Sequence, residues 1–235
     1  SCMERAKAAG KIRHIGFSFH DDLEVFREIV DFYDWDFCQI QYNYADTEEQ
    51  AGTAGLEYAA SKGLGVVIME PLRGGKLAVP APHLAEVFPK EKKPAEWALD
   101  FLWNRPEVSV VLSGMSTEQQ VEENLEYASR SHVGMLKEED MEMYCRAGEI
   151  FNTMALVKCT RCEYCMPCPS GINIPEIFSI YNRTATDGKN AAKELYKAQE
   201  TKADACIRCR RCEKVCPQHI GISAMMLEIQ EEFQD

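Results

Sequence analysis

The first 150 residues alternate between short apolar runs and longer segments whose apolar residues recur with helical spacing. The apolar runs predict strands, and the segments between them predict amphipathic helices. The predicted strands are residues 14–19, 37–42, 65–69 and 108–112. The predicted helices are residues 22–33, 48–62, 94–104 and 117–129. A Pro- and Gly-rich insertion at residues 71–93 lengthens the third unit and is long enough to be a functional loop.

Four successive strand–helix units with nearly continuous apolar strands predict a parallel sheet covered by helices. Two architectures fit: a doubly wound open sheet, and half of an eightfold barrel. A whole barrel needs about 250 residues, so these units can supply only part of one. In either architecture, ligands bind where the strands end. That edge collects Ser18, Phe19, His20, Asn43, Tyr44, Glu70, Pro71, Leu72, Ser113, Gly114, Met115, Ser116 and Thr117.

Several groups at this edge suit a phosphate or an amide. The backbone at Gly74, Gly75 and Gly114, the Ser116 hydroxyl and the helix beginning near Thr117 can donate hydrogen bonds to an anion. Ser and Gly are also common in ordinary strand-to-helix loops, so both interpretations stay open.

Three titratable side chains near the predicted strands have alternatives of their own. His14 lies within the first strand and is expected to pack in the core. His20 follows that strand and either contacts a substrate or cofactor or is a solvated loop residue. Glu70 ends the third strand, where a hydrogen-bonded structural role is expected rather than a carboxylate beside a cofactor.

Cysteine and charge divide the chain into two regions. Eight of its 11 cysteines fall between Cys159 and Cys216. Residues 1–150 hold 15 basic and 27 acidic side chains, a net charge of −12, whereas residues 151–235 hold 11 of each. We therefore expect two domains, residues 1–150 and residues 151–235.

The charge and the apolar runs also bear on partners. A net charge of −12 argues against electrostatic binding to nucleic acid or to an anionic membrane. No apolar run approaches the ~20 residues of a membrane helix, and the first residues show no secretory signal. The expectation is a cytoplasmic chain with neither nucleic acid nor membrane as a partner.

Two cysteine runs carry the most specific chemistry. Each has three cysteines at three-residue spacing, which aims three thiolates at three irons, and a fourth cysteine followed by Pro. This run is typical of ferredoxins, and in two-cluster ferredoxins the fourth cysteine ligates the other cluster. The runs predict two [4Fe–4S] clusters, one held by Cys159, Cys162, Cys165 and Cys216, the other by Cys206, Cys209, Cys212 and Cys168.

Disulfides and zinc are the competing explanations. Disulfides suit small secreted domains, and the triplet spacing would strain them. Zinc sites use cysteine pairs, whereas each run here supplies three or four ligands by itself. The first run is one residue shorter than the usual bacterial form, which affects only the cross-cluster ligand. Cys2, Cys38 and Cys145 stand apart and are expected to be buried or incidental.

Helical stretches at residues 174–182 and 189–201 separate the two runs, so the region resembles a helical ferredoxin module. Basic side chains beside the ligands would offset the negative charge of the clusters and raise their reduction potentials, or simply form a solvated basic face. They are Lys158, Arg161, Arg208, Arg210, Arg211 and Lys214.

Four segments of the first region resemble the second half of an aldo/keto reductase, in the order and spacing of that family. They are GKIRHIGFS at 10–18, QIQYN at 39–43, MEPLRGG at 69–75, and SGMS at 113–116 with EENL at 122–125. The resemblance implies the second half of a TIM (β/α)8 barrel, followed here by a mainly α-helical ferredoxin-like domain. It also implies an extended nicotinamide dinucleotide, NADP(H) or NAD(H).

Carried over by position, the family's cofactor contacts fall on twelve residues. Ser18 and Gln39 would hold the nicotinamide carboxamide, and Pro71, Leu72, Gly74 and Gly75 would line the pyrophosphate. Gly114, Met115 and Ser116 would flank the adenosine phosphate, while Glu123 and Asn124 would contact the adenine. Gln120 stands where many members use an Arg on the 2′-phosphate, Phe19 replaces an Asn that assists Ser18, and Met69 replaces a stacking aromatic ring.

The same resemblance places the family's catalytic Tyr, Asp, Lys and His in the first half of the barrel. We therefore expect no catalytic residue within this chain, which resembles a C-terminal fragment. Some aldo/keto reductase-like proteins carry a ferredoxin-type extension, and the resemblance to them covers nearly the whole chain. It implies an oxidoreductase that couples reduction of a small carbonyl substrate to electron transfer, with a ferredoxin or other redox partner. The alternative is an iron–sulfur module with an electron-transfer or structural role.

Overall fold

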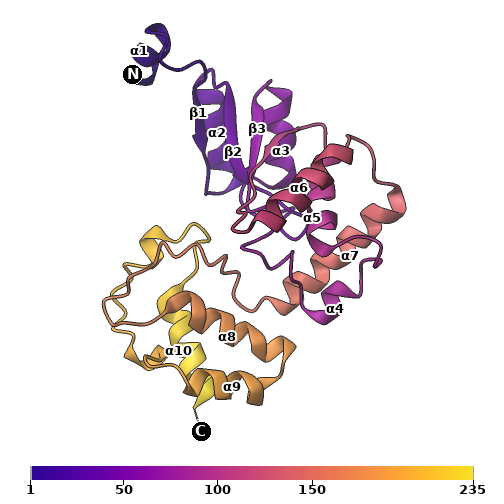
Figure 1. Cartoon of the computed structure of the whole chain (residues 1–235). Coiled ribbons are helices and arrows are strands. Elements are labelled where there is room, and N and C mark those ends of the chain that lie inside the picture. The colour runs from indigo at the N-terminus through magenta and orange to yellow at the C-terminus, as the bar shows by residue number, and fades with distance from the viewer. Residues whose placement is uncertain (1, 235) are drawn as a thin grey trace. The chain divides into compact units, whose positions relative to one another are not determined.

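A computed structural model describes residues 2–234, and the chain divides into two compact units, residues 1–149 and 150–235 (Figure 1). The first unit contains a four-stranded parallel sheet, and the second is built mainly of helices. Within residues 2–234, no helix has the length and apolar character needed to span a membrane.

The sheet of the first unit consists of β1 (Gly16–Ser18), β2 (Phe37–Gln41), β3 (Gly65–Met69) and β4 (Val108–Val111). The helices of this unit are α1 (Cys2–Ala8), α2 (Leu23–Phe32), α3 (Gly52–Ser61), α4 (Pro82–Ala85), α5 (Pro94–Trp103), α6 (Glu118–Arg130) and α7 (Glu138–Met154), whose last residues belong to the second unit. Pairing is parallel throughout, with Ser18 beside Gln39 and Gln41 beside Met69.

The strand order β1-β2-β3-β4 decides between the two architectures. Right-handed crossovers that always step in the same direction place their helices on one face of the sheet, as in a barrel, whereas a doubly wound sheet reverses direction. Cys38 and Ile40 on β2 and Ile68 on β3 are fully buried on one face. Gln39 and Met69 alternate with them and are only half-buried. The predicted fold class, a TIM-barrel type of α/β fold followed by a mainly helical region, is confirmed.

Two local expectations differ from the structure. The predicted helix at residues 48–62 begins only at Gly52, because Gln50 has a φ of +57°, outside the helical range, and Gly52 itself also has a φ of +57°. The expectation that His14 packs in the core is wrong. His14 precedes β1, and its side chain is 64% exposed. Its Nδ1 lies 3.4 Å from the Asp36 Oδ1 atom.

Helix α7 completes the core of the first unit, although the sequence pattern does not single it out. Tyr144 on this helix donates a hydrogen bond to the Trp97 carbonyl oxygen at 2.7 Å and contacts the rings of Tyr44, Phe88 and Phe101. Gly148, one turn further on, lets the helix approach the strand-end loop, since a Cβ there would lie 2.8 Å from the Tyr44 carbonyl oxygen.

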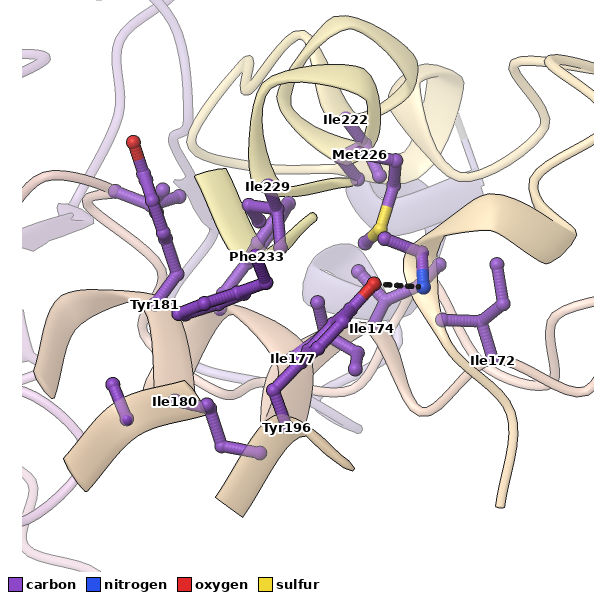
Figure 2. Close-up of a cluster of buried hydrophobic side chains, with 14 residues drawn as sticks. Ile172, Ile174, Ile177, Ile180, Tyr181, Tyr196, Ile222, Met226, Ile229 and Phe233 are labelled. Atoms are coloured by element: carbon purple, nitrogen blue, oxygen red, sulfur yellow. Dashed lines mark hydrogen bonds between the residues drawn. The ribbon is translucent and has the colours of Figure 1, made fainter. Parts of the chain in front are cut away.

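The second unit packs α8 (Ile174–Thr186), α9 (Lys189–Lys197) and α10 (Ile222–Phe233) around one apolar cluster (Figure 2). The 3-10 turns η1 (Ala203–Ala205) and η2 (Glu213–Val215) carry the chain between α9 and α10. The Tyr196 ring stacks on Phe233 at 4.6 Å, and its hydroxyl accepts a hydrogen bond from the Ala203 backbone N–H at 3.0 Å. This bond ties η1 to the core immediately before the second cysteine run.

The second unit contains an internal repeat. The segment CPSGINI at residues 168–174 leads into α8, and CPQHIGI at residues 216–222 leads into α10. Both form the same turn: the N–H of Gly171 donates to the Cys168 carbonyl oxygen at 2.9 Å, and the N–H of His219 to that of Cys216 at 3.1 Å. Gly171 and His219 both have positive φ, +75° and +49°. The two halves thus present their cysteines on equivalent scaffolds.

Candidate functional site

The eight clustered cysteines border two hollows in the second unit. One hollow, of about 20 Å³, is lined by Cys159, Cys162, Cys165 and Cys216. The other, of about 410 Å³, is lined by Cys168, Cys206, Cys209 and Cys212, and Cys165 also reaches its edge. The structure therefore brings the predicted ligands together in two sets, with the fourth cysteine of each run beside the other run.

The two runs share a backbone conformation around their middle cysteines. The residues on either side of the middle cysteine have positive φ in both runs: Arg161 and Glu163 at +61° and +64°, Arg208 and Arg210 at +53° and +56°. Such alternation of backbone conformation forms an anion-binding concavity. In the first run, the Arg161 N–H lies 3.4 Å from the Cys159 sulfur. Hydrogen bonds of this kind to sulfur raise the reduction potential of a cluster.

Burial follows the same pattern in both runs. The middle cysteines, Cys162 and Cys209, are exposed. The other six pack against the apolar core of the unit: Cys159, Cys165, Cys168, Cys206, Cys212 and Cys216. Each hollow is thus closed on the core side and open on the side of one cysteine.

Burial sets the protonation state of the thiols. It raises the pKa of Cys165 to about 12, with a further contribution from the negative charge of Cys159, Cys162 and Cys216. Burial also raises the pKa of Cys212, against hydrogen bonds from backbone N–H groups. These thiols are neutral at physiological pH on their own, and coordination to a metal displaces the proton.

The donor set fits iron–sulfur clusters. Among residues 2–234, no three histidine, cysteine or carboxylate side chains converge on a single metal ion. A [4Fe–4S] cluster instead takes one thiolate for each of four irons, from ligands spread around it. The smaller hollow has room for about one water molecule, so its thiols must move apart to admit a cluster. All eleven cysteines lie in the described part of the chain, and none forms a disulfide.

A second cavity, of about 500 Å³, lies in the first unit where β3 and β4 end. Most of the residues carried over as dinucleotide contacts line it: Pro71, Leu72, Gly74, Gly75, Gly114, Met115, Gln120, Glu123 and Asn124. Its volume is in the range of small-molecule and cofactor sites. Of the described residues that line it, none is a tyrosine, histidine or lysine.

Ser18 and Gln39 lie beside each other on adjacent strands. The Gln39 amide nitrogen is 3.4 Å from the Ser18 hydroxyl and 3.5 Å from the Met69 sulfur. Met69 lines the cavity, so these side chains continue its wall across β2 and β1. Phe19 turns to the other side, where it is buried with its ring 4.9 Å from Phe26. It contributes to the core and gives Ser18 no polar support.

The far end of the cavity is formed by the start of α6. The Gln120 side chain accepts hydrogen bonds from the backbone N–H of Ser116 at 2.8 Å and of Thr117 at 3.2 Å. Together with the Thr117 hydroxyl, which accepts from the Gln120 N–H, this forms a capping box. Asn124 donates to Ser113 at 3.0 Å, which ties the helix to the loop after β4.

The sequence pattern does not reveal a buried polar network under this cavity. Asp46 accepts hydrogen bonds from the side chains of Gln41 and Asn43, both at 2.9 Å, and forms an ion pair with Arg73. Asn43 also donates to the Glu70 carbonyl oxygen at 3.0 Å. The network therefore joins the loop after β2 to the loop after β3. The sequence does show that two charged residues, Asp46 and Arg73, follow strand ends. No local pattern indicates that the two form a pair.

Glu70 is the first residue of the loop after β3. Its φ of +55° and the +47° of Arg73 bend the chain sharply before Gly74. Burial raises the pKa of Glu70, while a hydrogen bond from the Gly74 backbone and the charge of Arg73 oppose this. The carboxylate thus holds the turn that forms one wall of the cavity, in line with the structural role expected for it.

The remaining cysteines are separate from both hollows. Cys38 is fully buried on β2, and burial raises its pKa to about 12. Cys2 and Cys145 are exposed.

Comparison with known proteins agrees with this division. The model of the aldo/keto reductase family matches residues 1–82, and that of the 4Fe-4S dicluster domain matches residues 155–220. No curated protein gives a match to the sequence. Similar solved structures include the holo and apo forms of aldo-keto reductase AKR11C1 from Bacillus halodurans, both 22% identical with a TM-score of 0.53. These matches cover 61% of this chain and 53% and 54% of those chains.

The chain thus spans about half the length of these two structures, and the likeness to them is one of fold. The two family matches fall in different structural units and do not overlap. Residues 1–82 are thus similar to the aldo/keto reductase family, and residues 155–220 are similar to the 4Fe-4S dicluster domain.

Proposed function

We propose that the second unit holds two [4Fe–4S] clusters and transfers single electrons. The observation that carries this proposal is that the eight cysteines line two hollows, four at one and the other four at the second, with Cys165 bordering both. The first cluster takes Cys159, Cys162, Cys165 and Cys216, and the second takes Cys206, Cys209, Cys212 and Cys168. When bound, each cluster accepts or donates one electron without a change in its ligands.

The polypeptide's part in this chemistry is to hold and tune the clusters. The Arg161 N–H, which lies 3.4 Å from the Cys159 sulfur, would lower the energy of the reduced, more negative state of the first cluster. The apolar core behind six of the cysteines excludes water on that side. The middle cysteines, Cys162 and Cys209, are exposed, so they would hold each cluster on the side from which electrons can enter or leave.

We infer that the cavity of the first unit binds a nicotinamide dinucleotide. Gly74 and Gly75 would face the pyrophosphate with backbone N–H groups, and Gly114, Met115 and Ser116 would flank the adenosine phosphate. Ser18 and Gln39 would hold the carboxamide, and Glu123 and Asn124 the adenine. Gln120 carries no charge to pair with a 2′-phosphate, so NADP(H) is favoured over NAD(H) only slightly.

In the complete enzyme, the dinucleotide would pass a hydride to the carbon of a small carbonyl substrate while a proton goes to its oxygen, which gives the alcohol and the oxidised cofactor. Returning the oxidised cofactor to its reduced form takes two electrons and one proton, so two single electrons from the clusters would balance one turnover if a two-electron carrier such as a flavin collected them. No tyrosine, histidine or lysine is found among the described lining residues to supply the proton. This chain alone should therefore bind the cofactor without reducing carbonyls.

The lack of a proton donor among the described lining residues also favours a second candidate. This candidate is an electron-transfer or structural iron–sulfur module without carbonyl reductase activity. The two are separated by titrating the anaerobically reconstituted chain with NADPH and NADH and following the fluorescence of the reduced cofactor. Saturable binding that is weakened by replacing Gly75 with Val supports the dinucleotide site. A cluster-loaded chain that binds neither cofactor supports the module and contradicts the enzyme.

A further inference from the structure

The two cysteine runs have the same backbone but opposite surroundings. At equivalent positions, Arg161 corresponds to Arg208 and Glu163 to Arg210. Tyr164 corresponds in the same way to Arg211. The repeat therefore serves as an internal comparison: the scaffold is constant, and charge is what differs between the two loops.

In the first run, the arginine is already paired. Its guanidinium lies 3.0 Å from the Glu176 carboxylate and 3.3 Å from the Ser179 hydroxyl, both on α8. Glu163 adds a negative charge in the same loop. With clusters in place, the surface around the exposed Cys162 would attract an acidic protein less than the surface around Cys209 does.

In the second run, the basic side chains stay available. No ion pair is found for Arg208 or Arg211 within the described residues, and the Arg210 side chain is 72% exposed. The nearest acid, Glu213, is 3.9 Å from Arg210, but its other oxygen accepts from the N–H and hydroxyl of Ser223 at 2.7 and 2.6 Å. This carboxylate is therefore directed toward the start of α10.

Apolar side chains accompany this charge. Ile207 is 69% exposed beside Cys206, and Val215 is 49% exposed just before Cys216. A small patch of exposed apolar residues within a basic rim is suited to a weak, short-lived contact with a partner. Such a contact is what repeated delivery of single electrons requires, because the partner must leave after each transfer.

We propose that Ile207, Arg208, Arg210, Arg211 and Val215 form the docking surface for an acidic one-electron carrier protein, and that electrons enter and leave through the cluster at Cys209. This inference rests on the proposed function, since it needs the second cluster. The step is one electron from the reduced carrier to the oxidised cluster, or the reverse, with no proton and no bond exchanged. The first cluster would then exchange electrons with the carrier through the second cluster.

The test follows electron transfer from the photoreduced, cluster-loaded chain to carriers of opposite charge. Oxidised rubredoxin is the acidic probe, cytochrome c the basic probe, and benzoquinone a small uncharged oxidant that reports changes in the clusters themselves. The variant is Arg208→Gln/Arg211→Gln. The matched control is Arg183→Gln/Lys189→Gln, which removes the same charge from exposed positions around α8 and α9, away from the cysteine hollows.

We expect the wild-type rate constant with rubredoxin to fall about tenfold or more as ionic strength rises from about 10 mM to 300 mM. At low ionic strength, Arg208→Gln/Arg211→Gln should lower the ratio of the rubredoxin rate to the benzoquinone rate about tenfold. The control variant should change that ratio less than about twofold, and cytochrome c should not show the loss.

A cluster-loaded variant that reacts with rubredoxin as fast as the wild type overturns the docking surface. So does an equal loss in the control variant, or a variant whose main change is in self-association measured by light scattering. A chain that takes up no iron–sulfur cluster contradicts the proposed function together with this inference, so the two failures are distinguished by iron content.

Discussion

Arg73 and Asp46 form an ion pair in the interior of the first unit, with side chains that are 1% and 0% exposed. The pair joins two strand-end loops, and the Arg73 loop continues into Gly74 and Gly75 at the wall of the cavity. A buried pair of this kind holds its loops in one arrangement as long as both charges are present, because either charge alone is costly in an apolar interior.

Removing one partner should therefore destabilise the first unit strongly. We expect Arg73→Met and Asp46→Leu each to cost about 3–5 kcal/mol in the free energy of unfolding, and the double variant to cost less than their sum. Urea unfolding followed by tryptophan fluorescence measures this, since Trp35, Trp97 and Trp103 all lie in the first unit.

The control is the exposed pair of Lys62 and Asp31, which are 46% and 51% exposed. Lys62→Met should cost less than about 1 kcal/mol. Equal effects of Arg73→Met and Lys62→Met would contradict the role of the buried pair.

The Tyr196 hydroxyl should matter for one cluster more than for the other. Tyr196→Phe leaves the buried N–H of Ala203 without its partner, at a cost of about 1–3 kcal/mol. Because Ala203 begins the turn that leads to Cys206, iron of the second cluster should be released faster to a chelator in mild urea. Tyr181→Phe is the matched change, since its hydroxyl donates to Glu228 at a partly exposed position. Equal rates of iron release in the two variants would count against this account.

Asp36 should make the stability of the first unit sensitive to acid. The Lys7 side chain and then the Ile15 N–H lower the pKa of Asp36 to about 2, against about 3.9 in an unfolded chain. The carboxylate therefore stabilises the folded state above about pH 4, and this contribution is lost as the pH falls toward 2. We expect the difference in stability between wild type and Asp36→Asn to shrink over that range.

The measurement is urea unfolding of both proteins at several pH values between 5 and 2, again by tryptophan fluorescence. Helix α1 should also become more accessible to protease in Asp36→Asn at neutral pH, because none of its residues is buried and Lys7 ties it to Asp36 at 2.7 Å. A difference that stays constant with pH would contradict the prediction.

Gln120 should control the choice between dinucleotides. Gln120→Arg places a cation at the position expected to face the 2′-phosphate, so affinity for NADPH relative to NADH should rise about tenfold, as for one charge-assisted contact. Loss of the capping box should lower stability by about 0.5–2 kcal/mol. The control for the added charge alone is Gln119→Arg, because Gln119 is next to Gln120 in the sequence but does not line the cavity. An equal shift in the control would show that long-range charge is responsible.

The sequence pattern predicts the elements whose side-chain periodicity is regular. Strand β3 occupies the predicted residues 65–69, and α5 and α6 lie close to their predicted ranges. Helix α3 starts later than predicted because Gln50, two residues before it, has positive φ, and the spacing of apolar residues carries no information about φ. Helices α7 and α10 were not predicted: Tyr144 and Phe233 are apolar anchors in mixed segments, and only the packed core shows what they cover.

The cysteine sites are predictable because their spacing is local, with three ligands within seven residues. The pairing of Arg73 with Asp46, 27 residues earlier, is not encoded in any local pattern. The difference between Arg161 and Arg208 is also invisible in the sequence, since both lie at the same place in the same motif. Only the structure shows that Glu176 on α8 forms an ion pair with Arg161.

The proposal that each cluster takes its fourth ligand from the other run can be tested by counting iron in two double variants. The wild-type chain, reconstituted without oxygen, should hold about eight irons and eight sulfides. Cys162→Ala/Cys216→Ala removes two ligands of one cluster and should leave about four irons. Cys162→Ala/Cys168→Ala removes a ligand from each and should leave almost none. The reverse pattern, or a wild-type chain that holds about two zinc ions instead, would contradict the account.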